Sequence, residues 1–159
     1  NNRYMKNIYG FFGDSNINIF RGLQLQIKNV YINKYKGIPI KSIVNKNENY
    51  LSIIKNINKY NYTHIYFLFG VVDVNFYYYY KKYIDKQDNV FENMCNYIKE
   101  YVRDINDLPV SNKYIFGILP SHIKTTYFKQ LLIRYHVFND DNINLISDND
   151  DIDIINKLT

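Results

Sequence analysis

Short apolar runs alternate along the chain with longer segments in which apolar residues recur every three or four positions. Continuous apolar runs predict buried strands at 8–12, 63–69 and 113–119, with a further candidate strand at 25–31. Helical spacing predicts helices at 17–23, 48–60, 90–105, 127–135 and 152–158. In the helix over 48–60, Leu51, Ile54 and Ile57 are expected to share the apolar face.

This alternation predicts the fold class. Strands that are apolar on both faces and flanked by helices are typical of a parallel sheet covered on both sides. We therefore expect an α/β fold, a three-layer α/β/α sandwich with a mostly parallel sheet of the flavodoxin-like kind. The 159 residues suffice for one domain, and 47% hydrophobic residues exclude a disordered chain.

Composition and charge add limited constraints. The net charge is +5, and acidic residues crowd the last twenty positions. No apolar run has the roughly 20 residues of a membrane span, and no signal peptide is visible at the start. With the single cysteine Cys95, these features predict a cytoplasmic or intracellular protein. The chain also lacks an initiator Met, so we expect an excerpt of a longer protein.

Candidate chemistry falls at the predicted strand ends, where open α/β sheets bind ligands. Gly13-Asp14-Ser15-Asn16 follows the first strand, Gly37 lies after the next, and Gly70-Val71-Val72-Asp73 follows the third. A serine at a strand-to-helix turn can act as a nucleophile when a base takes its proton. Glycines at neighbouring strand ends permit the close backbone approach of an oxyanion hole.

These residues resemble the sequence blocks of the SGNH (GDSL-type) hydrolases over roughly residues 6–120. Phe12-Gly13-Asp14-Ser15 is similar to the first block, whose serine is the nucleophile, and Gly37 takes the place of the second-block glycine. The run Gly70-Val71-Val72-Asp73-Val74-Asn75 resembles the third block in relatives that act on capsular or surface polysaccharides. The resemblance implies Ser15, Asp14, Gly37, Gly70, Asp73 and Asn75 as site residues.

The chain departs from the family at two points. Val72 stands where the family has an oxyanion-binding asparagine, unless Asn75 or Asn16 replaces it. The late Asp-x-x-His block is missing, because Asp141 and Asp153 are followed by asparagine at that spacing. Three alternatives remain open: the base lies beyond Thr159 in a longer chain, His122 or His136 serves, or the domain is catalytically inactive.

Simpler interpretations apply to the same residues. Asp14 and Ser15 are favoured helix-capping residues, and Asp73 is typical of a loop that bonds its own backbone. His64 begins a strand and therefore lies at the wrong end for the site. His122 suits a surface loop, and His136 suits a helix C-terminus.

The run Tyr77-Tyr78-Tyr79-Tyr80, followed by Lys81 and Lys82, either covers the sheet edge or stacks on sugars or nucleobases. The cysteine and three histidines lack metal-ligand spacing, and no cofactor motif is present. The sequence therefore predicts an esterase that acts on a small-molecule or carbohydrate ester without a cofactor. An inactive SGNH-like binding or structural domain is the main alternative, and nucleic-acid binding is a weaker one.

Overall fold

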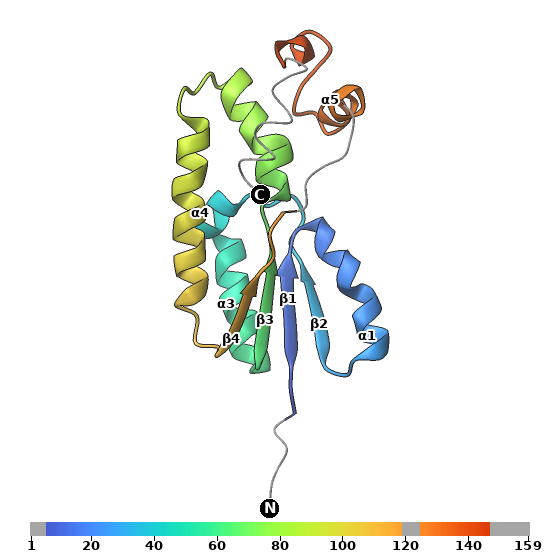
Figure 1. The fold of residues 1–159 in the computed structure, drawn as a ribbon, viewed down its shortest axis with the longest axis vertical. Helices are drawn as coiled ribbons and strands as arrows, with labels where there is room; N and C mark the ends of the chain where they lie inside the picture. The colour runs from blue at the N-terminus through green and yellow to red at the C-terminus, as the bar shows by residue number, and fades with distance from the viewer. Residues whose placement is uncertain (1–5, 119–124, 147–159) are drawn as a thin grey trace, which may run out of the picture. The chain divides into compact units, whose positions relative to one another are not determined.

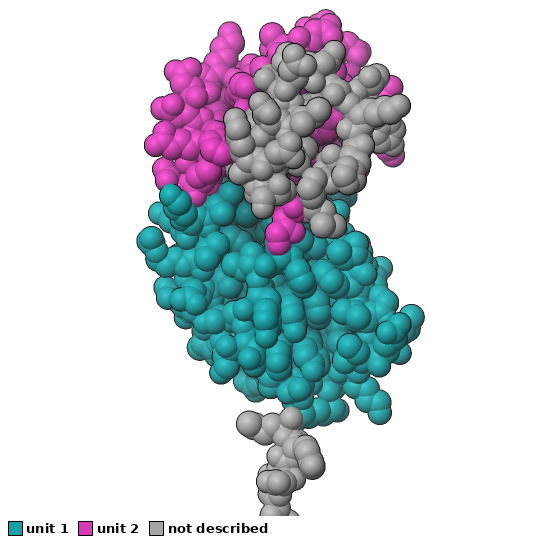
Figure 2. All heavy atoms as spheres, in the orientation of Figure 1, with its two compact units in different colours: residues 1–69, 97–116 teal, residues 70–96, 117–159 magenta. Residues whose placement is uncertain are grey.

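The structure is a computed structural model that describes residues 6–118 and 125–146. The chain divides into two compact units, shown in Figure 2. Unit 1 comprises residues 1–69 and 97–116, and unit 2 comprises residues 70–96 and 117–159. The single domain expected over 1–159 stays a prediction.

Unit 1 is built on a parallel sheet. Its strands in the described residues are β1 (Tyr9–Gly13), β2 (Val30–Lys34), β3 (His64–Leu68) and β4 (Asn112–Ile115). Their order is β2-β1-β3-β4, and every neighbouring pair is parallel. The all-parallel sheet and its flanking helices confirm the α/β fold expected from the sequence (Figure 1).

Helices cover both faces of this sheet. On one face lie η1 (Ser15–Gly22) and α1 (Leu23–Gln26), and Ile17 of η1 packs with Phe11 and Val30. On the opposite face lie α3 (Glu48–Tyr60) and the part of α4 (Val90–Asn106) that belongs to unit 1, after the short helix α2 (Ile40–Val44) (Figure 1). Asn56 of α3 donates to Asn33 of β2 at 3.2 Å, and Tyr101 of α4 contacts the Phe69 ring. The three layers are therefore present.

Unit 2 is helical in its described residues. Residues 71–84 form one helical segment that contains the π-turns η2 (Asp73–Tyr77) and η3 (Tyr80–Ile84). It is joined in this unit by α5 (Thr125–Arg134) and the short turn η4 (Ile143–Leu145). The Tyr79 ring, 1% exposed, packs on Phe128 of α5 at 5.0 Å. No helix among the described residues is both long and apolar enough to cross a membrane.

The periodicity located most elements well but misplaced one strand. The expected strand at 25–31 is wrong: residues 23–26 are helical and β2 begins at Val30. Asn29 has φ 64°, a left-handed conformation that turns the chain into β2, and Leu25 is 91% exposed. The alternating apolar residues Leu25 and Ile27 wrongly indicated a strand, because alternation over a few residues does not show where a turn lies.

Two expectations about burial are also corrected. Leu51 is 61% exposed, whereas α3 buries Ile57, as expected, together with Ile53. The strand expected to be buried at 113–119 is the edge strand β4, where Tyr114 is 46% exposed. Residue 119 and the helix expected at 152–158 lie outside the described residues.

Gly13 allows η1 to pack closely on the end of β1. A Cβ atom at Gly13 would lie 2.5 Å from the Leu68 carbonyl oxygen and 3.0 Å from the Cβ of Ile17. The first of these atoms belongs to the backbone of β3, so it cannot move without disturbing the sheet. Glycine is therefore required by the close approach of three segments.

We expect Gly13→Ala to lower the free energy of unfolding by about 1–3 kcal/mol, the usual cost of overpacking. Gly22→Ala is the matched control, because a Cβ there meets nothing within 4 Å and the backbone is helical. The control should be neutral or slightly stabilising. Urea unfolding of both variants measures the difference, and an equally stable Gly13→Ala protein would contradict the packing argument.

Tyr62 makes the stability of unit 1 sensitive to alkaline pH. Its hydroxyl donates to Asn56 Oδ1 at 2.7 Å, and burial raises the pKa of Tyr62 to about 12. The folded state therefore keeps a proton that the unfolded chain releases near pH 10. We expect the free energy of unfolding to fall as pH rises from 10 to 12, and to fall less steeply in Tyr62→Phe. Equal slopes in denaturant titrations at pH 9, 10, 11 and 12 would refute this expectation.

Candidate functional site

The strand order identifies where unit 1 would bind a ligand. Connections from β1 and β3 leave the sheet toward opposite faces, because η1 covers one face and α4 the other. Such a switch point forms a crevice at the carboxyl ends of the two strands. Gly13 and Leu68 are partners in the β1–β3 register, and the Asp14 N–H donates to the Leu68 carbonyl at 3.2 Å. The Asp14–Ser15 turn therefore lies at the switch point.

Asp14 caps η1 and is almost completely buried. Its Oδ1 accepts hydrogen bonds from the Asn16 backbone N–H at 2.9 Å and from Asn16 Nδ2 at 3.0 Å. The residue is 1% exposed, and its Oδ2 has no hydrogen-bond partner in the part of the chain that the structure describes. The capping role considered for Asp14 is thus observed, and Asn16 uses its amide in the same cap.

Ser15 is the first residue of η1 and is exposed. It directly follows the buried residues 11–14, so the chain reaches the surface at this serine. The first N–H groups of a helix have no partners within the helix and carry the positive end of its dipole. A hydroxyl at this position is accessible and lies in a setting that favours negative charge.

Gly37 lies at the same edge of the sheet. Gly13 pairs with Lys34 at the end of β2, and the Tyr35 N–H donates to the Gly13 carbonyl at 2.8 Å. Two residues later Gly37 has φ 69°, is exposed, and has open space around the position of a Cβ. Gly37 thus supplies a left-handed turn that a residue with a Cβ adopts only with strain.

Tyr35 anchors this turn to the body of unit 1. Its ring lies 6.3 Å from that of Phe69, and its hydroxyl is 3.4 Å from Ser52 Oγ. Burial raises the pKa of Tyr35, while the Ser52 hydrogen bond acts in the opposite direction. The phenol therefore stays neutral at physiological pH and acts as a structural support.

The third-block residues belong to unit 2. Gly70 has φ 115°, and its carbonyl accepts the Val74 N–H at 3.0 Å at the start of the helical segment. Asp73 is 1% exposed and begins η2, and Asn75 lies within that turn. The structure therefore places Asp14, Ser15 and Gly37 at one edge of unit 1, and Gly70, Asp73 and Asn75 in unit 2.

Histidines do not complete a triad within the described part of unit 1. His64 begins β3 at the amino edge of the sheet, as expected, where its Nδ1 is 2.9 Å from Thr63 Oγ1. His136 belongs to unit 2, is exposed, and follows the C-terminus of α5 with φ 57°. His122 and Asp153 lie outside the described residues. The described residues contain no cluster of three His, Cys, Asp or Glu side chains that could hold a metal ion.

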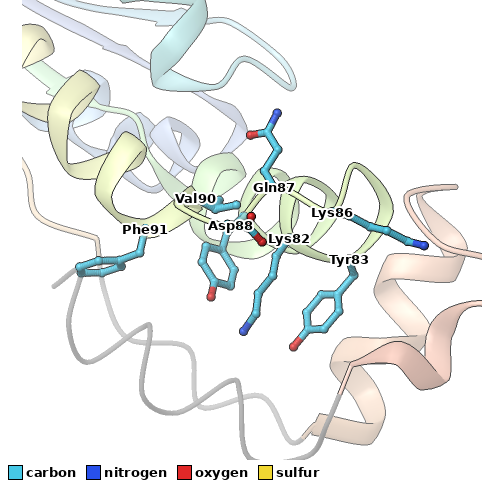
Figure 3. Close-up of a pocket in the computed structure, with 8 residues that line it drawn as sticks. Lys82, Tyr83, Lys86, Gln87, Asp88, Val90 and Phe91 are labelled. Atoms are coloured by element: carbon cyan, nitrogen blue, oxygen red, sulfur yellow. The ribbon is translucent and has the colours of Figure 1, made fainter.

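The tyrosine and lysine segment lines a separate cavity of about 420 Å³ in unit 2. Lys82 Nζ lies 5.6 Å from the Tyr78 ring centre and 5.1 Å from that of Tyr83. Figure 3 shows the Lys82 and Tyr83 side chains on the same side of the segment, while Gln87 points the other way. Two of the four tyrosines in the run, Tyr78 and Tyr79, are buried, so packing accounts for a large part of this motif.

The sequence interpretation missed the lysines that flank the Gly37 turn. Lys34 and Lys36 are exposed and adjoin Gly13 and Gly37. A signal was present, because residues 15–47 contain six Lys or Arg residues and no Asp or Glu. The net charge of +5 concealed this stretch, since acidic residues later in the chain offset it.

No family model, no curated protein and no solved structure matches the chain. What this edge does is therefore inferred from its own residues and geometry.

We expect Asp14→Ala to lower the free energy of unfolding by about 1 kcal/mol, the usual value of an N-cap. Asp14→Asn keeps an oxygen acceptor for the Asn16 N–H and should restore most of that loss. Chemical unfolding of both variants separates capping from charge. If Asp14→Asn were as unstable as Asp14→Ala, the negative charge rather than the cap would be the stabilising feature.

Proposed function

We propose that the chain is an SGNH-like hydrolase that cleaves an acyl ester, on a carbohydrate or a small molecule, with Ser15 as nucleophile. The observation that supports this proposal most directly is the exposed Ser15 at the switch point of a parallel sheet, immediately after a buried, capped Asp14. The turn combines an accessible hydroxyl with the N-terminus of an eight-residue helix.

The proposed chemistry follows from these groups. The Ser15 Oγ attacks the ester carbonyl and a base takes its proton, which gives a tetrahedral oxyanion. Backbone N–H groups of Ser15 and Gly37 are the proposed donors to that oxyanion. Collapse expels the alcohol, which receives the proton, and water then releases the acid from Ser15. A histidine is the proposed base, as the resemblance implies, and no cofactor takes part.

A non-catalytic binding domain is the second candidate, and one observation favours it. The one histidine in the described part of unit 1, His64, lies at the amino edge of the sheet, away from Ser15. Val72 at the third-block position also lacks a side-chain donor. In this case the residues at the switch point would bind a ligand without catalysing a reaction on it.

Turnover of p-nitrophenyl acetate by the full-length protein tests the two candidates. We expect Ser15→Ala to lower kcat by at least about 10³-fold, because removal of a nucleophile abolishes the covalent route. Ser111→Ala is the matched control, since Ser111 is exposed and precedes β4 at the opposite edge.

Equal rates for wild type and Ser15→Ala would eliminate Ser15 as nucleophile. A wild-type protein that fails to turn over any ester would favour the binding domain.

A further inference from the structure

Charge is distributed unequally between the two compact units. Residues 1–69 and 97–116 contain 13 Lys or Arg and five Asp or Glu, a net charge of +8. Residues 70–96 and 117–159 contain seven and ten, a net charge of −3. The net charge of +5 for the whole chain therefore conceals how basic unit 1 is. Such an excess raises the local concentration of anionic ligands.

The excess is concentrated in the stretch that contains the candidate site. Asp14 is the single acidic residue between Lys6 and Asn47, and Glu48 follows only at the start of α3. The Asp14 side chain is 1% exposed and accepts hydrogen bonds from Asn16. Among the described residues it forms no ion pair with the lysines of this stretch.

Two lysines lie at the same edge of the sheet as Ser15. Lys34 is the register partner of Gly13, and adjacent strands are about 4.8 Å apart. Val30 and Ile32 pack on the face that η1 covers, so the alternation of β2 directs Lys34 to that same face. Lys36 adjoins Gly37 in the following turn.

Both lysine side chains are exposed. Neither has an ion-pair partner among residues 6–118 and 125–146, where the ion pair present is Lys81–Asp85 of unit 2. Lys46 differs from these two lysines because acidic residues lie near it: it lines a small cavity together with Glu100 and Asp104 of α4. Lys34 and Lys36, which form no ion pair in the described part of the chain, are called the lysine pair.

We propose that the lysine pair recognises an anionic substrate, and that the ester cleaved at Ser15 is carried by an acidic carbohydrate. This inference rests on the proposed function and names its substrate class. Carboxylates on the carbohydrate would be attracted to the lysine pair, which would hold a neighbouring ester near the Ser15 hydroxyl.

A nucleic acid fits this edge less well. Single-stranded nucleic acids bind through successive bases stacked on aromatic side chains as well as through phosphates. Tyr35 is the single aromatic residue between Asn33 and Asn47, and it is half-buried with its hydroxyl near Ser52. The tyrosine run that suggested stacking belongs to unit 2, whose net charge is negative. A polyanion without bases is therefore favoured.

Acetate release from two polymers of equal acetyl content tests the proposal: partly O-acetylated polygalacturonate and partly O-acetylated glucan. We expect the wild type to prefer the anionic polymer and the Lys34→Gln/Lys36→Gln variant to lose about tenfold in kcat/KM, mostly through KM. Rising salt should reduce the wild-type preference.

Lys6→Gln/Lys28→Gln is the matched control, because these exposed lysines precede β1 and β2 at the amino edge. It removes the same charge and should leave kcat/KM unchanged. Equal kcat/KM for both polymers, or equal losses in both double variants, would overturn the proposal while Ser15-dependent hydrolysis stood.

A protein without Ser15-dependent hydrolysis would refute the proposed function instead. Affinity electrophoresis in polygalacturonate gels then decides the inference. Retardation of Ser15→Ala that is lost in Lys34→Gln/Lys36→Gln supports an acidic-carbohydrate site. Absence of retardation, or tighter binding to a single-stranded oligonucleotide, overturns it.

Discussion

The close packing of η1 on the ends of β1 and β3 is the constraint on which the candidate site depends. At Gly13 there is no room for a Cβ between the Leu68 carbonyl and Ile17. This contact fixes the first turn of η1 over the sheet, and Asp14 holds that turn through Asn16. Ser15 is exposed at the switch point, while Asp14 before it and Ile17 two residues after it are buried.

The tightly packed Gly13 also lies next to one of the exposed lysines. Gly13 pairs with Lys34, so the strand end that must lack a side chain lies next to one that carries a cation. The tightly packed Gly13 therefore lies beside a strand end that carries a cation, at the edge where Ser15 is exposed. The buried Asp14 carboxylate is engaged by Asn16, so it contributes to folding without offering its charge to solvent.

The fold was largely predictable because its strands are short, continuous and apolar. The apolar run at 63–69 contains β3 of a parallel sheet, because a continuous apolar strand is stable where both faces of the sheet are covered. Predictions from local patterns were wrong where tertiary contacts determine the structure. The alternation of Leu25 and Ile27 resembled a strand, yet the left-handed Asn29 delays β2 until Val30. Spacing alone also did not show that Leu51 faces solvent.

For the candidate site, sequence reasoning located residues but not their environments. The sequence shows that a glycine, an aspartate and a serine follow an apolar strand. The burial of Asp14 and the exposure of Ser15 depend on the position of η1, which the sequence does not show. Gly37 was assigned by order along the chain, and the register of β1 and β2 explains why it reaches the same edge. Lys34 and Lys36 were overlooked because total charge averages over two units of opposite sign.

Recognition of a ligand and chemistry on it place different demands on this edge. Catalysis needs a base within hydrogen-bonding reach of Ser15, and an absent base cannot be replaced by charge elsewhere. Electrostatic attraction needs only exposed cations without counter-ions, which Lys34 and Lys36 provide. The basic edge would therefore be of equal use to an esterase and to a binding domain. The proposed affinity for an anionic carbohydrate depends on unit 1 alone, whichever of the two the chain proves to be.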